Sequence, residues 1–91
     1  MRIEFDPAKS ERNERERDLP FERVADFDFL TAVYRTDDRR EYGEVRMRAL
    51  GWLEDRLHAL VFTPIDGGIR VISFRKANRR EMKKYAQESQ S

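Results

Sequence analysis

The sequence predicts an α+β domain in which a small antiparallel sheet of about four strands is flanked by two N-terminal helices and one C-terminal helix. Two observations predict this fold. Segments after Gly43 alternate apolar and charged side chains and are joined by short turns, and helix-capping sequences stand at both ends of the chain. Its 91 residues suffice for one compact domain over residues 1–91, with a frayed tail expected at 87–91.

Two helices are expected before residue 30. Residues 2–5 predict a short opening strand, after which Asp6 and Pro7 supply an N-cap and a first helical residue. The helix predicted over 8–18 is polar around its circumference, so we expect its charges to form a solvated face. A second short helix is predicted from Phe21, where apolar residues recur at helical spacing.

The middle of the chain predicts strands over 30–35, 44–53, 57–63 and 69–75. Short connections favour antiparallel pairing of the last three strands. A final helix is predicted after Asn78, because Glu81 three residues later completes a capping-box pattern. The expected element order is β-α-α-β-β-β-β-α, or nearly so.

Basic and acidic side chains are unevenly distributed along the chain. The totals are 19 Lys or Arg and 18 Asp or Glu, but residues 1–42 carry 9 basic and 12 acidic side chains, whereas residues 43–91 carry 10 and 6. Seven of the bases fall between Arg70 and Tyr85, with Glu81 as the one carboxylate. This local positive charge predicts contact with a polyanion, RNA or DNA.

Several classes of protein and site are disfavoured by composition. The chain has no Cys and a single His, His58, so a disulfide scaffold, a cysteine nucleophile and a metal site are not expected, and no cofactor is implied. No apolar run approaches the ~18 residues that a membrane span needs, and no signal-peptide pattern is present, so a cytoplasmic location without membrane contact is expected.

Charged side chains alternate along two of the predicted strands. In the first, the period of two places Glu44, Arg46 and Arg48 on one face, where they can hold phosphates or simply form an ionic surface. In the last, it places Arg75 and Ser73 with Val71, and Arg70 on the opposite face. A cation at Arg70 among apolar neighbours needs a partner, either a carboxylate or a phosphate.

The junction between the last strand and the last helix is the stronger signal for an anion site. Arg75, Lys76, Arg79 and Arg80 stand there beside the backbone N–H groups that begin the helix. Tyr85 is open to two interpretations, since its ring belongs to the packing face while its hydroxyl can reach a bound base.

Four blocks of the sequence resemble one family over almost the whole chain. The blocks are Phe5-Asp6-Pro7-x-Lys9 with Asn13, Phe21-Glu22 with Ala25, Glu44-x-Arg46 with Ala49-Leu50-Gly51, and Ile69-Arg70-Val71-Ile72-Ser73-x-Arg75-Lys76-Ala77-x-x-Arg80-Glu81 with Tyr85. In this order they are similar to the BrnT toxins of bacterial type II toxin-antitoxin systems. The resemblance implies a RelE-like fold and a ribonuclease that arrests translation.

The same resemblance implies the partners. These are RNA, a BrnA-type antitoxin with a DNA-binding dimerisation domain, and promoter DNA reached only through that antitoxin. The chain departs from the family at Glu16-Arg17-Asp18, where Lys-His-Gly is common, and at Phe74, where Ala is usual. The first departure leaves the general base and acid, and the activity of this copy, open.

For a metal-independent ribonuclease we expect in-line attack of a ribose 2′-hydroxyl on its own phosphodiester. The expected catalytic residues are Glu44 as the base and Arg46, Arg70 and Arg75 as the phosphate clamp. The expected RNA-binding residues are Arg48, Lys76, Arg79, Arg80, Lys83 and Tyr85. Two alternatives remain: a non-catalytic partner of a DNA-binding antitoxin that acts as co-repressor, and a small RNA- or DNA-binding module.

Overall fold

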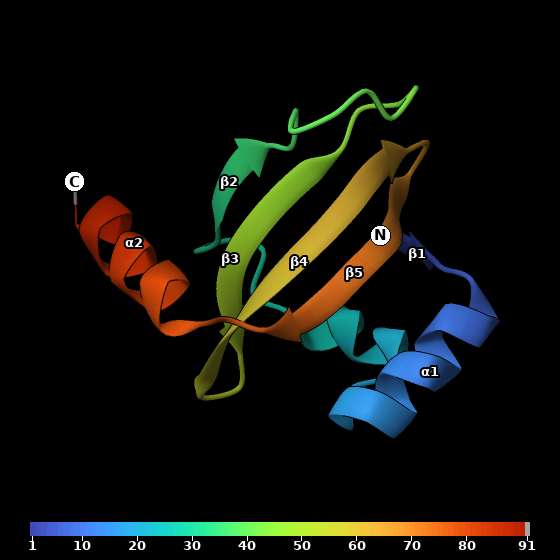
Figure 1. Ribbon diagram of the computed structural model, residues 1–91, viewed down its shortest axis with the longest axis horizontal. Coiled ribbons are helices and arrows are strands. Elements are labelled where there is room, and N and C mark those ends of the chain that lie inside the picture. Colours follow the sequence, from blue (N-terminus) through green and yellow to red (C-terminus); the bar gives the residue numbers. More distant parts are fainter. Residues whose placement is uncertain (91) are drawn as a thin grey trace.

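A computed structural model describes residues 1–90 and contains one five-stranded sheet, two α-helices and one 3₁₀ helix (Figure 1). The order of strands across the sheet is β1-β5-β4-β3-β2. The elements are β1 (Arg2–Glu4), α1 (Pro7–Arg17), η1 (Phe21–Asp26), β2 (Val33–Thr36), β3 (Met47–Leu53), β4 (Arg56–Ile65), β5 (Gly68–Lys76) and α2 (Arg79–Ser89).

The predicted α+β class is confirmed, and two details of the prediction are wrong. The sheet has five strands and is mixed, because β1 pairs parallel with β5 while the other three pairings are antiparallel. A three-residue strand carries too little local pattern to reveal a partner more than sixty residues away. The second N-terminal helix is a 3₁₀ helix of six residues, a length at which an α-helix gains few hydrogen bonds.

The helix caps predicted from the sequence are confirmed. The Asp6 carboxylate accepts a hydrogen bond from the backbone N–H of Ala8 at 2.9 Å, and Pro7 is the first residue of α1. At α2 the Asn78 side chain accepts from the Glu81 N–H at 2.8 Å, and the Glu81 carboxylate accepts from the Asn78 N–H at 2.9 Å. These contacts satisfy N–H groups that a helix start leaves without partners.

The main hydrophobic core lies between η1 and one face of the sheet. Val24, Leu60 and Phe74 are almost completely inaccessible, and burying such a side chain contributes roughly 1.5–3 kcal/mol. Gly51 of β3 lies where a Cβ would be 2.6 Å from Cζ of Phe27. The residues of this core are Leu19, Phe21, Val24, Phe27, Ala49, Leu53, Leu60, Phe62, Ile69, Val71 and Phe74.

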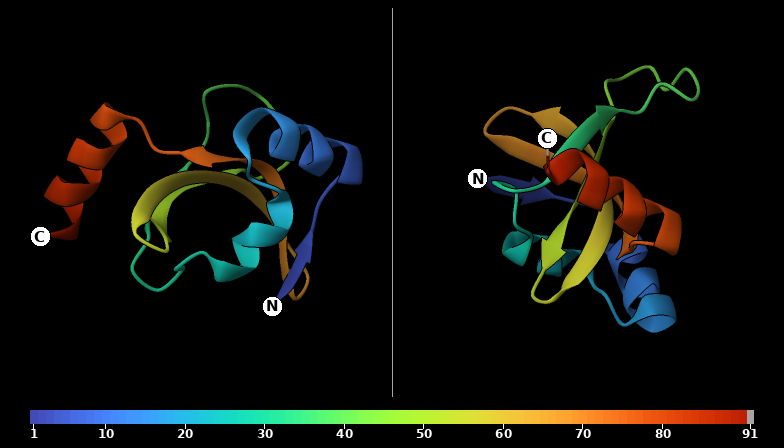
Figure 2. Two further views of the ribbon diagram at one scale, coloured as in Figure 1. Left: turned by 90° about the horizontal axis from the view of Figure 1, so that it is seen from below. Right: turned by 90° about the vertical axis from the view of Figure 1, so that its left-hand side faces the viewer.

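Helix α2 lies against the other face of the sheet. It packs through Tyr85 into a smaller cluster with Leu57 and Ala77. Figure 2 shows α2 at one side of the molecule and α1 with η1 at the opposite side. Helix α2 continues to Ser89, into the segment 87–91 expected to be frayed, and residue 91 of that segment lies outside the described residues.

A β-bulge in β5 changes which side chains share a face. Val61 of β4 is paired with Ser73, but its neighbour Phe62 is paired with Val71, so Ile72 is an extra residue. The prediction that Ser73 and Arg75 lie on the face of Val71 is therefore wrong. One extra residue reverses the alternation, so that Val71 and Phe74 both face the core while Ser73 and Arg75 share the other face with Arg70.

Two predicted strands are shorter at their beginnings. The strand expected at 44–53 starts at Met47, and Val45, which precedes it, is exposed. The strand expected at 30–35 is β2 over 33–36, because the Asp28 carboxylate holds the N–H groups of Leu30 and Thr31 in a turn.

Helix α1 covers the part of the β5 edge that β1 leaves unpaired. Strand β1 pairs only with residues 68–70. Farther along, the Asn13 side-chain amide donates to the backbone carbonyls of Phe74 at 2.8 Å and Leu19 at 2.7 Å. An edge carbonyl of the sheet is thus satisfied by a side chain of the helix. Within residues 1–90, the helices fall short of the length and apolar character that crossing a membrane requires.

Candidate functional site

A cationic pocket of about 320 Å³ lies on the sheet face opposite the main core. Strand register builds it: Arg35, Arg48, Val61 and Ser73 stand side by side across β2, β3, β4 and β5. Adjacent strands are ~4.8 Å apart, and the two middle positions of the pocket floor carry the small residues Val61 and Ala59. The volume is many times the roughly 30 Å³ of one water molecule, so the pocket can admit a phosphodiester.

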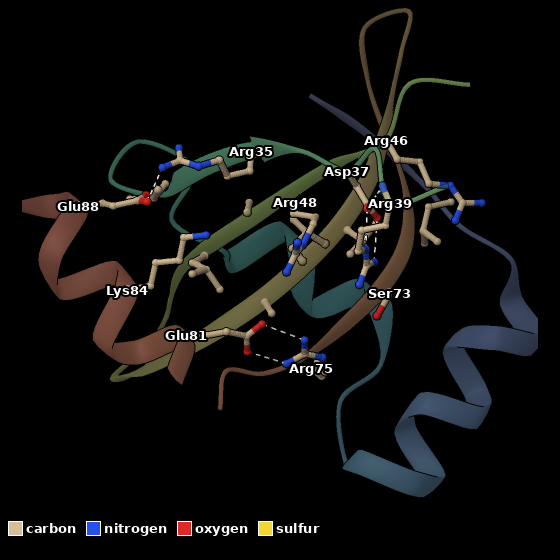
Figure 3. A pocket seen from close by; sticks show the side chains of 17 residues that line it. Arg35, Asp37, Arg39, Arg46, Arg48, Ser73, Arg75, Glu81, Lys84 and Glu88 are labelled. Atoms are coloured by element: carbon tan, nitrogen blue, oxygen red, sulfur yellow. Dashed lines mark hydrogen bonds and ion pairs between the residues drawn. The ribbon is translucent and has the colours of Figure 1, made fainter. Parts of the chain in front are cut away.

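Helix α2 forms one wall of the pocket with Glu81, Lys84 and Glu88, which share one helix face (Figure 3). The Arg75 guanidinium donates two hydrogen bonds to the Glu81 carboxylate, at 2.8 and 3.0 Å. Arg35 forms an ion pair with Glu88. The hydrogen bonds from Arg75 hold the pKa of Glu81 below its usual range, so the carboxylate is ionised at neutral pH.

The loop after β2 contributes a second wall. Arg39 donates to the buried Asp37 carboxylate through Nε at 2.7 Å and Nη2 at 2.9 Å, which lowers the pKa of Asp37 to about 2. Arg46 lies 4.0 Å above the ring of Tyr42, a cation–π contact. Asp37, Arg39 and Arg46 are the charged side chains through which this loop lines the pocket.

The pocket has an excess of positive charge. Its cations are Arg35, Arg39, Arg46, Arg48, Arg75 and Lys84, and its carboxylates are Asp37, Glu81 and Glu88, so six positive charges face three negative charges. Arg48 lies at the centre, and Lys84 extends from α2 over the sheet (Figure 3). Within the described part of the chain neither forms an ion pair within 4.0 Å, and these two cations remain available to an anionic ligand.

The four expected catalytic residues separate into two groups. Arg46 and Arg75 line the pocket. Glu44 and Arg70 do not line it; instead they form an ion pair of 2.5 Å with each other. Glu44 also accepts from Thr63 Oγ1 at 3.2 Å and from Arg46 Nε at 3.4 Å, so Arg46 connects this pair to the pocket. The contact with Arg70 is the main cause that lowers the pKa of Glu44.

Of the expected RNA-binding residues, only Arg48 lines the pocket. Lys76 faces a separate hollow beside His58, and Arg79, Arg80 and Lys83 are outside the pocket lining. Tyr85 is buried: its hydroxyl donates to the Thr31 carbonyl at 3.0 Å, and its ring packs edge-to-face on Trp52.

The start of α2 is already occupied by a carboxylate of the chain. Glu81 accepts from both the Asn78 N–H and Arg75, and it therefore sits where the sequence predicted an external phosphate. The pocket is instead centred on the sheet face formed by β2, β3, β4 and β5.

The charged residues that line the pocket but were not predicted from the sequence include Arg35, Asp37, Arg39 and Lys84. Arg35 shares a face with Val33 in the predicted strand, a signal that strand periodicity contained. Lys84 follows Glu81 by three residues on the same helix face. Asp37 and Arg39 lie in a polar loop, where no periodicity indicates orientation.

The described residues also bear on metal and histidine chemistry. Over residues 1–90, His, Cys, Asp and Glu form no group of three or more placed to hold a metal ion. His58 is buried, with Nδ1 2.9 Å from the Arg56 carbonyl, and its ring lies against Phe74 of the core. Burial lowers the pKa of His58, which favours the neutral ring.

Comparison with known protein families identifies a match over most of the chain. A family model described as the ribonuclease toxin BrnT of type II toxin-antitoxin systems matches residues 5–81. This range includes the pocket-lining strands and the capping box of α2. No curated protein matches the chain. The matched range covers most of the sequence, and the chain belongs to the BrnT family of ribonuclease toxins.

Proposed function

We propose that this chain is an active endoribonuclease toxin that binds an RNA phosphodiester in the cationic pocket, cleaves it there and thereby arrests translation in the cytoplasm. The observation that carries the proposal is the pocket's excess of positive charge, with Arg48 and Lys84 available at its centre and open side. Guanidinium and ammonium groups donate strong, charge-assisted hydrogen bonds to phosphate oxygens.

The proposed reaction uses the nucleophile that RNA itself carries. The 2′-oxygen bonds to the adjacent phosphorus while the bond from phosphorus to the 5′-oxygen breaks. A base takes the 2′ proton, and the leaving oxygen gains a proton. The protein positions the strand, transfers these protons and stabilises the extra negative charge on the phosphoryl oxygens. This route requires no metal ion, and we propose that cleavage is metal-independent.

Charge stabilisation is the larger part of the proposed catalysis. The carboxylates Glu44 and Glu81 both have lowered pKa values, so each is ionised at pH 7 but is a weak proton acceptor. Arg75 still has donors to offer, because a guanidinium has five N–H bonds, and two go to Glu81 and one to the Lys76 carbonyl. We assign Arg46, Arg48, Arg75 and Lys84 to the phosphate.

Cleavage of RNA by the purified protein in EDTA tests the proposal. Arg75→Ala removes a pocket guanidinium and is expected to reduce the rate about 10²-fold. Comparing Glu44→Gln with Glu81→Gln identifies the proton acceptor, since Gln at the third helical position retains the capping box. Arg70→Ala tests whether the neighbouring ion pair contributes. Each variant is first checked for folding by circular dichroism. A folded wild type that cleaves neither free RNA nor RNA on translating ribosomes contradicts the proposal.

A second function is favoured by the carboxylates already present in the pocket. Glu81 and Glu88 of α2 occupy Arg75 and Arg35, so acidic side chains of another protein can bind the same guanidinium groups. We propose that an antitoxin of BrnA type neutralises the toxin there, and that the pair binds promoter DNA through the antitoxin. Tight complex formation by a protein without nuclease activity would favour a purely regulatory partner over an enzyme.

A further inference from the structure

A second basic groove lies next to the cationic pocket, between α1 and β5. Ile72 and Ser73 of β5 line both hollows, so the groove and the pocket meet at the bulge. Figure 1 shows α1 beside the β5 side of the sheet. A polymer lying in the pocket can therefore continue over the β5 edge and along the helix.

Helix α1 presents a basic face to this groove. Its lining residues are Lys9, Arg12, Asn13, Glu16 and Arg17, whose spacing of three and four residues defines one face of a helix. That face has three positive charges and one negative charge, a balance of +2. The other charged positions of α1 are Glu11, Glu14 and Arg15, a balance of −1. The helix therefore has a basic face toward the groove and a slightly acidic remainder.

The three groove cations are available to a ligand. In the described range, Lys9, Arg12 and Arg17 have no ion pair within 4.0 Å and no side-chain hydrogen bond to the protein. Glu11 and Arg15, which are four residues apart on the same helix, also form no ion pair in this range. Asn13, by contrast, is held by its hydrogen bonds to Phe74 and Leu19, which fix the helix against the sheet edge. The cations therefore stand on a rigidly placed element.

We propose that this α1 groove is a second RNA-binding subsite, which holds the sugar-phosphate backbone of the strand whose scissile phosphate lies in the pocket. The inference rests on the proposed function and extends it, because it sets the substrate class as a single strand of several nucleotides. From Lys9 to Arg17 the helix rises ~12 Å, enough to meet more than one phosphate. Phe21, the aromatic residue that lines the groove, is buried. Binding of the strand therefore depends on charge interactions with its phosphates rather than on base stacking.

RNA binding and cleavage by matched variants test this subsite. Arg12→Gln removes a groove cation, and Arg15→Gln removes one cation from the exposed opposite face of the same helix, with equal net charge. For a 12-nucleotide RNA at low salt we expect Arg12→Gln to weaken binding about 5-fold and to reduce the salt slope by roughly 0.7, the value for one single-strand phosphate contact. Arg15→Gln should change binding less than 2-fold. The triple variant Lys9→Gln, Arg12→Gln, Arg17→Gln should raise KM with little change in kcat.

A dinucleotide substrate and a pocket variant separate this inference from the proposed function. A dinucleotide is too short to reach α1, so the triple variant should cleave it as wild type does. If Arg48→Gln weakens RNA binding while Arg12→Gln and Arg15→Gln behave alike, the α1 subsite is refuted and RNA binding in the pocket is supported. If wild type binds no RNA, both proposals fail. If the α1 variants weaken binding of the antitoxin but not of RNA, the groove is a protein interface and the inference is wrong.

Discussion

Replacing Arg48 with Gln is the most direct test of the cationic pocket. Arg48 stands in register with Arg35 on one neighbouring strand and Val61 on the other, at the centre of the pocket floor. It forms no ion pair within 4.0 Å in the described part of the chain, but its charge contributes to the lowered pKa values of Asp37 and Glu81. Gln removes the positive charge, and its shorter side chain retains two of the five N–H donors.

The expected loss follows from the charge interaction. A unit charge ~4 Å from a phosphate charge is worth about 4 kcal/mol at the effective dielectric constant of a protein surface. The nearby carboxylates and the remaining cations reduce this value, and mutations of similar transition-state donors cost about 3 kcal/mol. We therefore expect cleavage to slow by roughly 10²-fold, since each 1.36 kcal/mol is a factor of ten.

The assay is single-turnover cleavage of an end-labelled RNA in EDTA. The matched control is Arg79→Gln, which removes the same charge from the exposed first turn of α2, outside the pocket. Thermal unfolding followed by circular dichroism should show both variants within about 0.5 kcal/mol of wild type. Equal losses of cleavage for Arg48→Gln and Arg79→Gln would refute a localised pocket and indicate that only overall charge matters.

Three further predictions concern the framework of the site. Asn13→Ala leaves two carbonyls without their donor and should lower stability by about 2 kcal/mol in denaturant unfolding, whereas Arg15→Ala should cost under about 0.5. Gly51→Ala brings a methyl group against Phe27 and should cost about 2 kcal/mol, more than the roughly 1 kcal/mol of Gly67→Ala, which meets only a positive φ of 75°. The pKa of Asp37, about 2 against a usual 3.8, means that its stabilisation is present above about pH 4 and is lost as the pH falls toward 2. We expect this loss to be about 1 kcal/mol, because Arg39 is exposed and solvent screens the ion pair. Asp37→Asn should abolish the loss when unfolding is measured as a function of pH in acid. A pH profile that stays unchanged in this variant would contradict the assignment to Asp37.

Local features of the fold were predictable because local sequence determines them. The Asp6 cap, the Asn78 and Glu81 capping box and the three long strands β3, β4 and β5 follow from side chains within a few residues of one another. The direction of β1 was not predictable, because its partner β5 is far away in the chain and three residues carry no register information. The bulge at Ile72 was not predicted for a related reason. An extra residue in β5 can be recognised only once the pairing of β4 with β5 is known.

The candidate site divides in the same way. An excess of bases in the second half of the chain predicted a polyanion site. Arg46 and Arg48 were named for it from strand periodicity, and Arg75 from its place at the strand-to-helix junction. The register of four strands and the packing of α2 over them decided which cations line the pocket. That packing added Arg35, Arg39 and Lys84 and left Lys76 and Lys83 outside the pocket.

The sequence by itself determined the α+β class, the capped starts of α1 and α2, the basic character of the C-terminal half and the family. Tertiary structure alone decided that Arg75 shares a sheet face with Arg70 rather than with Val71, and that Glu44 is paired with Arg70 outside the pocket lining. The physical reason is the range of the interactions. Capping and amphipathic periodicity act over a few residues, whereas the distance between two charges depends on pairing between strands that are remote in the chain.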